Sequence, residues 1–161
     1  ASGRDFYQVL TLASIVQQEA ALDSERALIA GVYTNRLNPR IWSTGLLNAD
    51  PTVFYAHDTI ELRAMAFEDW QQFAFWEPMT AALAGLKVPD DLAGYQTYAH
   101  RGLPPGPICS PTAASIQAAL QPDTSDGYLY FVAKGDGSHG HAFARTYAQH
   151  QANLRKYGYI K

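Results

Sequence analysis

The sequence predicts an α+β domain that is mostly helical and carries a small antiparallel β-hairpin. Apolar residues recur at helical spacing over most of the first 40 residues and again after residue 110. The segment from Gly127 to Ala133 is instead rich in aromatic and β-branched residues, as strands are. With 161 residues, 47% of them hydrophobic and 17% charged, the chain is expected to form one globular domain.

The first predicted helix runs from about Asp5 to Leu22. Leu12, Ile15 and Val16 share one face of it, and Glu19 falls inside that apolar stripe. An apolar surrounding raises the pKa of a carboxyl group, which a general acid near neutral pH requires. The same spacing also fits a glutamate at the rim of the helix, or one that is paired with an arginine.

A second helix is predicted to follow after a short link. Asp23 or Ser24 is suited to cap its first turn, where Glu25 is favourably placed. The helix is predicted to end at Asn38, because proline at position 39 disfavours helical geometry in the residue before it. The short link predicts that the two helices pack as an antiparallel pair.

Residues 41–49 are predicted to be irregular or weakly extended. Asp50 followed by Pro51 fits an N-cap and a proline at the first helical position, which predicts a short helix through Tyr55 or His57. Asp50 is also a candidate second carboxylate beside Glu19, but its expected capping role favours a structural interpretation.

An aromatic-rich insertion is predicted over about 58–94, with a short helix over 78–86. Its aromatic side chains are expected to pack on the core or along one side of a cleft. They are Phe67, Trp70, Phe73, Phe75 and Trp76.

Residues 102–108 contain three prolines and two glycines, which predicts a stiff loop. Such a loop suits the holding of backbone groups at a ligand, and it equally suits a plain connector. Ser110 is the predicted cap of a helix to about Leu120. After the strand, a glycine-rich turn over 135–140 and a return strand over 141–145 complete the hairpin, and Thr146 caps the last helix.

Charge and residue spacing exclude several classes of function. The net charge of −3 argues against nucleic acid or an anionic membrane as the main partner. No apolar run reaches the 18 residues of a membrane-spanning helix, and the single cysteine, Cys109, forms no intrachain disulfide. His139 and His141 have no further ligands nearby in sequence, so neither a metal site nor a cofactor is predicted.

Six motifs occur in order along the chain, and together they resemble the catalytic domain of the MltG (YceG-like) endolytic murein transglycosylases. They are Leu12–Glu19, Asn35–Leu37, Asp50–Val53, Tyr95–Tyr98, Gly102–Ile108 and Tyr128–Ala133. The resemblance implies one lysozyme-like catalytic domain over 1–161. It also implies an N-terminal membrane anchor and a LysM-like region that are absent from this chain. Gln17 and Gln96 depart from the family pattern, which usually has Glu and Asn there.

The resemblance implies cleavage of the β-1,4 bond between N-acetylmuramic acid and N-acetylglucosamine, leaving a 1,6-anhydro-muramyl end. Glu19 would protonate the glycosidic oxygen and then act as base on the C6 hydroxyl of the sugar. Because the substrate supplies the nucleophile, no second carboxylate is required. The residues carried over as lining the cleft are Asn35, Asp50, Thr52, Thr97, Tyr98, Leu103, Pro104, Pro105 and Gly106; Asn35 and Arg36 equally fit surface positions at the end of a helix.

The implied partners are peptidoglycan glycan strands and peptidoglycan synthases, with no nucleic acid, and contact with the membrane only through the anchor. A monomer is expected, on the outer face of the bacterial cytoplasmic membrane. Two alternatives stay open. One is a non-catalytic glycan-binding domain that recruits synthesis enzymes. The other is a hydrolase in which Glu19 and Asp50 lie about 6.5–9.5 Å apart around a water molecule.

Overall fold

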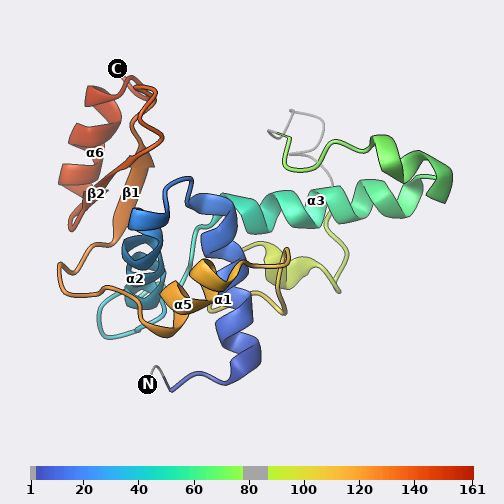
Figure 1. Cartoon of the computed structure of the whole chain (residues 1–161), viewed down its shortest axis with the longest axis horizontal. Helices are drawn as coiled ribbons and strands as arrows, with labels where there is room; N and C mark the ends of the chain where they lie inside the picture. Colours follow the sequence, from blue (N-terminus) through green and yellow to red (C-terminus); the bar gives the residue numbers. More distant parts are fainter. Residues whose placement is uncertain (1–2, 78–86) are drawn as a thin grey trace.

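The computed structural model describes residues 3–77 and 87–161. At its centre are the helices α1 (Phe6–Glu19), α2 (Arg26–Arg36) and α5 (Ala113–Leu120) (Figure 1). The antiparallel strands β1 (Tyr130–Ala133) and β2 (His141–Ala144) pack with α6 (Tyr147–Lys156) on one side of this group, and α3 (Asp50–Ala64) extends to the other. The predicted α+β class is confirmed. The helix predicted over 78–86 lies outside the described residues.

Helix α1 begins where the sequence predicts and ends earlier. The side chain of Asp5 accepts a hydrogen bond from the backbone N–H of Gln8, and the Gln8 side chain accepts one from the backbone N–H of Asp5, which closes a capping box. The expectation that the helix reaches Leu22 is wrong, because Ala20 is already extended. Two helices that pack side by side need a few non-helical residues to reverse the chain, and residues 20–22 supply them.

The start of α2 also differs from the prediction. Asp23–Glu25 forms a single 3₁₀ turn and no side chain caps α2, so the expected cap at Asp23 or Ser24 is wrong. Asp23 instead forms a 2.8 Å ion pair with Arg26. The antiparallel pairing is confirmed, since Arg4 before the start of α1 donates to Thr34 near the end of α2.

Helix α3 is longer than predicted and begins differently. The helix continues to Ala64 because residues 58–64 contain no glycine or proline and include several good helix formers. Asp50 is its first helical residue and caps nothing, so the expected N-cap role of Asp50 is wrong. The predicted insertion at 58–94 therefore starts inside a helix.

Most aromatic side chains of the 58–94 segment lie away from the core. Phe67 is 75% exposed and Phe75 is 52% exposed, and each contacts a neighbouring ring of the same segment, Trp70 and Phe73 respectively. Trp76 is the exception, because it packs against the core cluster. Of these five residues only Trp76 packs on the core, whereas Phe67 and Trp70 line a pocket within their own segment.

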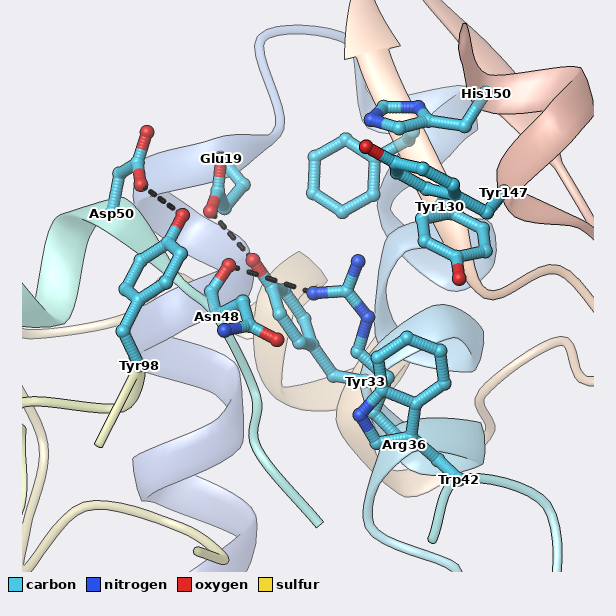
Figure 2. Close-up of a pocket in the computed structure, with 11 residues that line it drawn as sticks. Glu19, Tyr33, Arg36, Trp42, Asn48, Asp50, Tyr98, Tyr130, Tyr147 and His150 are labelled. Atoms are coloured by element: carbon cyan, nitrogen blue, oxygen red, sulfur yellow. Dashed lines mark hydrogen bonds between the residues drawn. The ribbon is translucent and has the colours of Figure 1, made fainter. Parts of the chain in front are cut away.

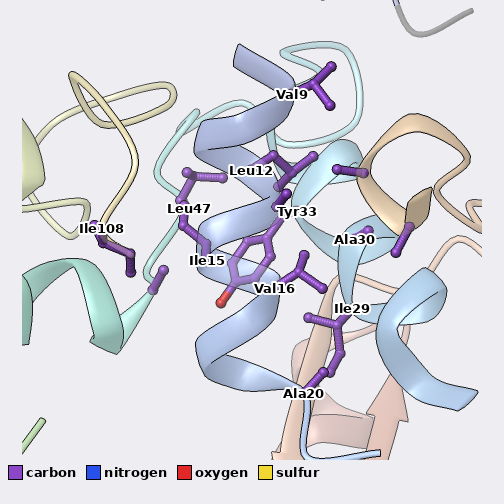
Figure 3. Close-up of a cluster of buried hydrophobic side chains, with 14 of the residues drawn as sticks. Val9, Leu12, Ile15, Val16, Ala20, Ile29, Ala30, Tyr33, Leu47 and Ile108 are labelled. Carbon is purple, nitrogen blue, oxygen red and sulfur yellow. The ribbon is translucent and has the colours of Figure 1, made fainter. Parts of the chain in front are cut away.

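The core lies between α1 and α2 and is completed by residues from later segments (Figure 3). Leu12, Ile15 and Val16 of the predicted stripe are fully buried, as are Ile29 of α2 and Leu47 of the following loop. Burial of each such side chain contributes about 1.5–3 kcal/mol. This packing holds the end of α1, with Glu19, at a defined place.

The predicted hairpin and last helix are confirmed, although the first strand begins at Tyr130 and not at Gly127. Phe131 pairs with Phe143 in the hairpin, and Thr146 caps α6 with a second capping box. Helix α5 ends at Leu120 as predicted, but it begins after Thr112 and not after Ser110, and Thr112 donates its hydroxyl to Gln17 instead of capping. Within residues 3–77 and 87–161, no helix is long and apolar enough to cross a membrane.

Candidate active site

Glu19 lines a cavity of about 430 Å³ between the end of α1, α2 and the β1 strand (Figure 2). This volume is within the range of sites that bind small ligands. We call it the aromatic cavity, because six of its eleven lining residues have Phe, Tyr or Trp rings. The lining residues are Glu19, Tyr33, Arg36, Trp42, Asn48, Asp50, Tyr98, Tyr130, Phe131, Tyr147 and His150.

Glu19 is a half-buried residue, and its carboxyl group is held by Tyr33, whose hydroxyl donates a 2.6 Å hydrogen bond to Oε1. The pKa of Glu19 is raised to about 7, chiefly by burial; the negative charge of Asp50 adds to the rise, whereas the Tyr33 hydrogen bond and the charge of Arg36 oppose it. Within the described residues, no arginine or lysine forms an ion pair with Glu19. A carboxyl group with this pKa can both give and accept a proton near neutral pH.

Arg36 brings a buried positive charge to the same cavity. Its guanidinium group donates to the backbone carbonyls of Leu129, Leu47 and Asn48, and it lies 5.5–5.9 Å from the ring centres of Tyr33, Trp42 and Tyr130. No carboxylate in the described part of the chain forms an ion pair with it. Arg36 therefore joins α2, residues 47–48 and the residue before β1 around the cavity, and it is not a surface residue.

Asp50 and Tyr98, both expected in the cleft, line the aromatic cavity together with Glu19. The hydroxyl of Tyr98 donates a 2.6 Å hydrogen bond to Oδ1 of Asp50. Burial and this bond to Asp50 raise the pKa of Tyr98, so the phenol stays protonated at neutral pH. Asp50 is exposed, and its second oxygen is free of hydrogen bonds to the rest of the described chain.

Thr52, Thr97 and Asn35 lie behind the cavity wall and are not among its lining residues. Thr52 and Thr97 are fully buried, share a 2.9 Å hydrogen bond and bind the backbone of Ala49. They hold the segment that carries Asn48 and Asp50. Asn35, which is 5% exposed, donates to the carbonyl of Tyr128 and so holds the start of the hairpin segment on α2.

The stiff loop lies at a different place from Glu19. Leu103, Pro104 and Pro105 line a separate cavity of about 540 Å³, beside the first turns of α1. Gly106 is buried, and a Cβ atom there would lie 2.3 Å from the hydroxyl oxygen of Tyr7. The structure thus does not bring the Leu103–Gly106 loop into the cavity of Glu19.

Several residues of the aromatic cavity escaped the sequence reasoning. Tyr147 and His150 lie three residues apart on α6 and so share a face, a spacing that could have been noticed. The ring of His150 stacks on Tyr130, with ring centres 5.1 Å apart, and burial lowers the pKa of His150. Tyr33 and Trp42 gave no sequence signal, because only the fold brings them to Glu19.

Glu19 also lines two further cavities that adjoin the first. One of about 270 Å³, the Trp76 cavity, is lined by Gln18, Glu19, Asp50, Pro51, Phe54 and Trp76. The other, of about 340 Å³, is the hairpin-turn cavity, lined by Glu19, Ala21, Ala133, Gly135, Gly137, His139, Gly140 and His141. Glu19 is therefore the point at which three cavities meet.

His141, the first residue of β2, is bound to Glu25. Nδ1 of His141 lies 2.7 Å from Oε2 of Glu25, and the backbone N–H of His141 also donates to that carboxylate. Across the described ranges, no group of three or more His, Cys, Asp or Glu residues is placed to hold a metal ion.

Comparison with known proteins identifies relatives over nearly the whole chain. An "Endolytic murein transglycosylase" of Bacillus subtilis (strain 168) is 34% identical over 151 residues, which cover 94% of this chain and 34% of that protein. A protein of the same description from Streptococcus pneumoniae serotype 2 (strain D39) is 30% identical, over 93% of this chain and 23% of its own length. The chain thus spans about a third or less of these relatives.

The fold has a counterpart among solved structures. The crystal structure of a YceG-like protein from Listeria monocytogenes superposes with a TM-score of 0.65 and is 31% identical, covering 91% of this chain and 39% of that one. The model of the YceG-like family matches residues 1–156. Because that match includes nearly every residue, the chain belongs to the YceG-like family.

Proposed function

We propose that this chain is the catalytic domain of an endolytic murein transglycosylase, with Glu19 as general acid and then general base. The observation that carries the proposal is the carboxyl group of Glu19, whose pKa is raised by burial to about 7, at the meeting point of three cavities. The two relatives that are described as endolytic murein transglycosylases support the same activity.

The reaction needs one carboxyl group only. Protonated Glu19 donates its proton to the oxygen of the bond between N-acetylmuramic acid and N-acetylglucosamine, and that bond breaks. The resulting carboxylate then takes the proton of the muramyl C6 hydroxyl, while the C6 oxygen forms a bond to the anomeric carbon. The products are a free N-acetylglucosamine hydroxyl and a 1,6-anhydro-muramyl end, and Glu19 is again protonated.

The shape of the site suits cleavage inside a strand. The aromatic cavity and the Trp76 cavity extend from Glu19, and both contain aromatic rings on which sugar faces can stack. Asp50 and Tyr98 would contact the substrate directly. Asn35, Thr52 and Thr97 would act indirectly, through the backbone that they hold.

Asp50 supports a second candidate, a hydrolase that uses Glu19 and Asp50. Its carboxylate is exposed, caps no helix and shares two cavities with Glu19, so it could activate a water molecule. The two reactions leave different ends: a hydrolase gives a reducing muramyl end, and a transglycosylase gives the anhydro end.

The test is mass analysis of the products after incubation of purified peptidoglycan with the chain and with its Glu19→Gln variant. Glu68→Gln, at an exposed glutamate outside all three cavities, is the matched control. We expect anhydro-muramyl ends from the wild type and from Glu68→Gln, and none from Glu19→Gln. Reducing ends would favour the hydrolase. Tight glycan binding without products from any of the three would favour the recruitment domain.

The proposed substrate indicates where in the cell the domain acts. Murein lies outside the cytoplasmic membrane, so the domain is proposed to act there, as a single unit over 1–161. We further propose that the whole protein has an N-terminal membrane anchor and a LysM-like region, acts as a monomer and works beside peptidoglycan synthases. The length of the relatives supports the additional regions, because each relative is about three to four times as long as the part that matches this chain.

A further inference from the structure

A linear strand that passes Glu19 needs two of the three cavities that meet there, one on each side of the bond to be cleaved. The third cavity is then free for a group that branches from the strand next to this bond. In murein the muramyl sugar carries such a branch, a peptide joined through its lactyl group. The inference therefore rests on the proposed function.

The side chains that line the three cavities differ in chemistry. Trp42, Tyr130 and Tyr147 line the aromatic cavity, and Phe54 and Trp76 line the second. The hairpin-turn cavity has no Phe, Tyr or Trp among its lining residues and is walled mainly by glycine and alanine. Because sugar rings are bound by stacking on aromatic faces, the first two cavities suit the strand and the hairpin-turn cavity does not.

The wall of the hairpin-turn cavity offers backbone groups. Within the described residues, the backbone N–H groups of Gly135, Gly137 and His139 donate to no other part of the chain. Such groups bind the carbonyls of an extended peptide. The ammonium group of Lys134 lies beside the same wall, 3.5 Å from where a Cβ atom on Gly140 would be, and suits the carboxylates of a peptide.

This wall is also held rigidly. The carboxylate of Glu25 accepts two hydrogen bonds from the backbone and ring of His141, and both side chains are largely buried, at 14% and 9% exposed. A Cβ atom on Gly140 would lie 3.2 Å from Glu25, so glycine permits the close approach. A preorganised wall binds a flexible ligand at a lower entropic cost.

We propose that the hairpin-turn cavity binds the stem peptide of the muramyl residue at the cleavage site. Its volume of about 340 Å³ is in the range of small-ligand sites, and it opens directly onto Glu19. The domain would then distinguish strands that bear peptides from strands that do not.

The experiment compares two substrates, purified murein with its stem peptides and the same murein after an amidase has removed them. Ala133→Tyr and Ala21→Tyr in the full chain each place a large side chain in the hairpin-turn cavity. Ala152→Tyr, on the exposed face of α6, is the control. We expect the ratio of kcat/KM for peptide-bearing to bare strands to fall about tenfold in the first two variants only. An unchanged ratio overturns the proposal.

A binding measurement separates this proposal from the proposed function. In the ¹⁵N-labelled Glu19→Gln variant, a muramyl disaccharide with its peptide is expected to shift the amide signals of Gly135, Gly137 and Gly140. The disaccharide without its peptide is expected to leave them unchanged. If the wild-type chain cleaves neither substrate and the variant still shows these shifts, the proposed activity would be contradicted and peptide binding supported. The absence of peptide-dependent shifts would overturn the peptide assignment even if cleavage is observed.

Discussion

The hydroxyl of Tyr33 donates to Oε1 of Glu19 over 2.6 Å, from a side chain that is only 1% exposed. The bond orients the carboxyl group and engages one of its oxygens. In the proposed reaction the acidic proton would then be carried by Oε2, the oxygen that Tyr33 does not engage. Tyr33 is thus a positioning residue in the proposed reaction, and its effect on the pKa of Glu19 can be measured.

Tyr33→Phe should move the alkaline limb of the pH–activity profile to higher pH. The reaction needs protonated Glu19, so activity falls as the pH rises through its pKa of about 7; the Tyr33 bond lowers that pKa, and its loss raises it. We also expect kcat to fall about tenfold, because the carboxyl group loses its orientation. Tyr157→Phe, at the end of α6, is the control, and an unmoved limb in Tyr33→Phe would contradict the assigned role.

Asp50→Asn should move the same limb in the opposite direction. The negative charge of Asp50 raises the pKa of Glu19, so its removal lowers that pKa and activity is lost at a lower pH. The amide oxygen can still accept the hydrogen bond from Tyr98. Rate measurements between pH 5 and 9 test this, together with analysis of the products. If Asp50 instead activates water, the variant should lose all turnover.

Stability should fall with rising pH because of Glu19. Its pKa is raised from 4.5 in the unfolded chain to about 7 in the folded one. Between these pH values the folded state binds more protons than the unfolded state, so the free energy of unfolding falls as the pH rises. Glu19→Gln removes the free-energy cost of holding a charged carboxylate in the folded state. The variant should be more stable than the wild type by up to about 3 kcal/mol at pH 8, and the difference should shrink towards pH 4.

Urea unfolding at pH 4, 6 and 8 measures this difference, with Glu68→Gln as the variant in which no such trend is expected. A gain in stability that is equal at all three pH values would show that burial of the Glu19 charge is not its cause.

Arg36→Lys should destabilise the fold by about 2–4 kcal/mol. The guanidinium group binds the carbonyls of Leu129, Leu47 and Asn48 at once, and a lysine ammonium cannot reproduce that planar geometry. Arg145→Lys is the matched control, since the ion pair of Arg145 with Asp126 is exposed and should contribute less than about 1 kcal/mol. Equal midpoints of urea unfolding for the two variants would contradict the role of Arg36.

The sequence by itself determined the features that depend on neighbouring residues. The spacing of Leu12, Ile15 and Val16 predicted a buried helix face, and the place of Glu19 in that face predicted the raised pKa. The hairpin and the cap at Thr146 were likewise predictable, because turn, strand and capping signals act over a few residues.

Tertiary structure alone decided what surrounds Glu19. Asp50 has the sequence pattern of a helix cap, yet its carboxylate binds Tyr98, 48 residues away, at the edge of the cavity. Arg36 enters the site through the carbonyl of Leu129, 93 residues away, and the proline-rich loop packs beside the start of α1, apart from Glu19. Such contacts depend on how the helices pack, and a pattern within one segment contains no information about the segment that will lie against it.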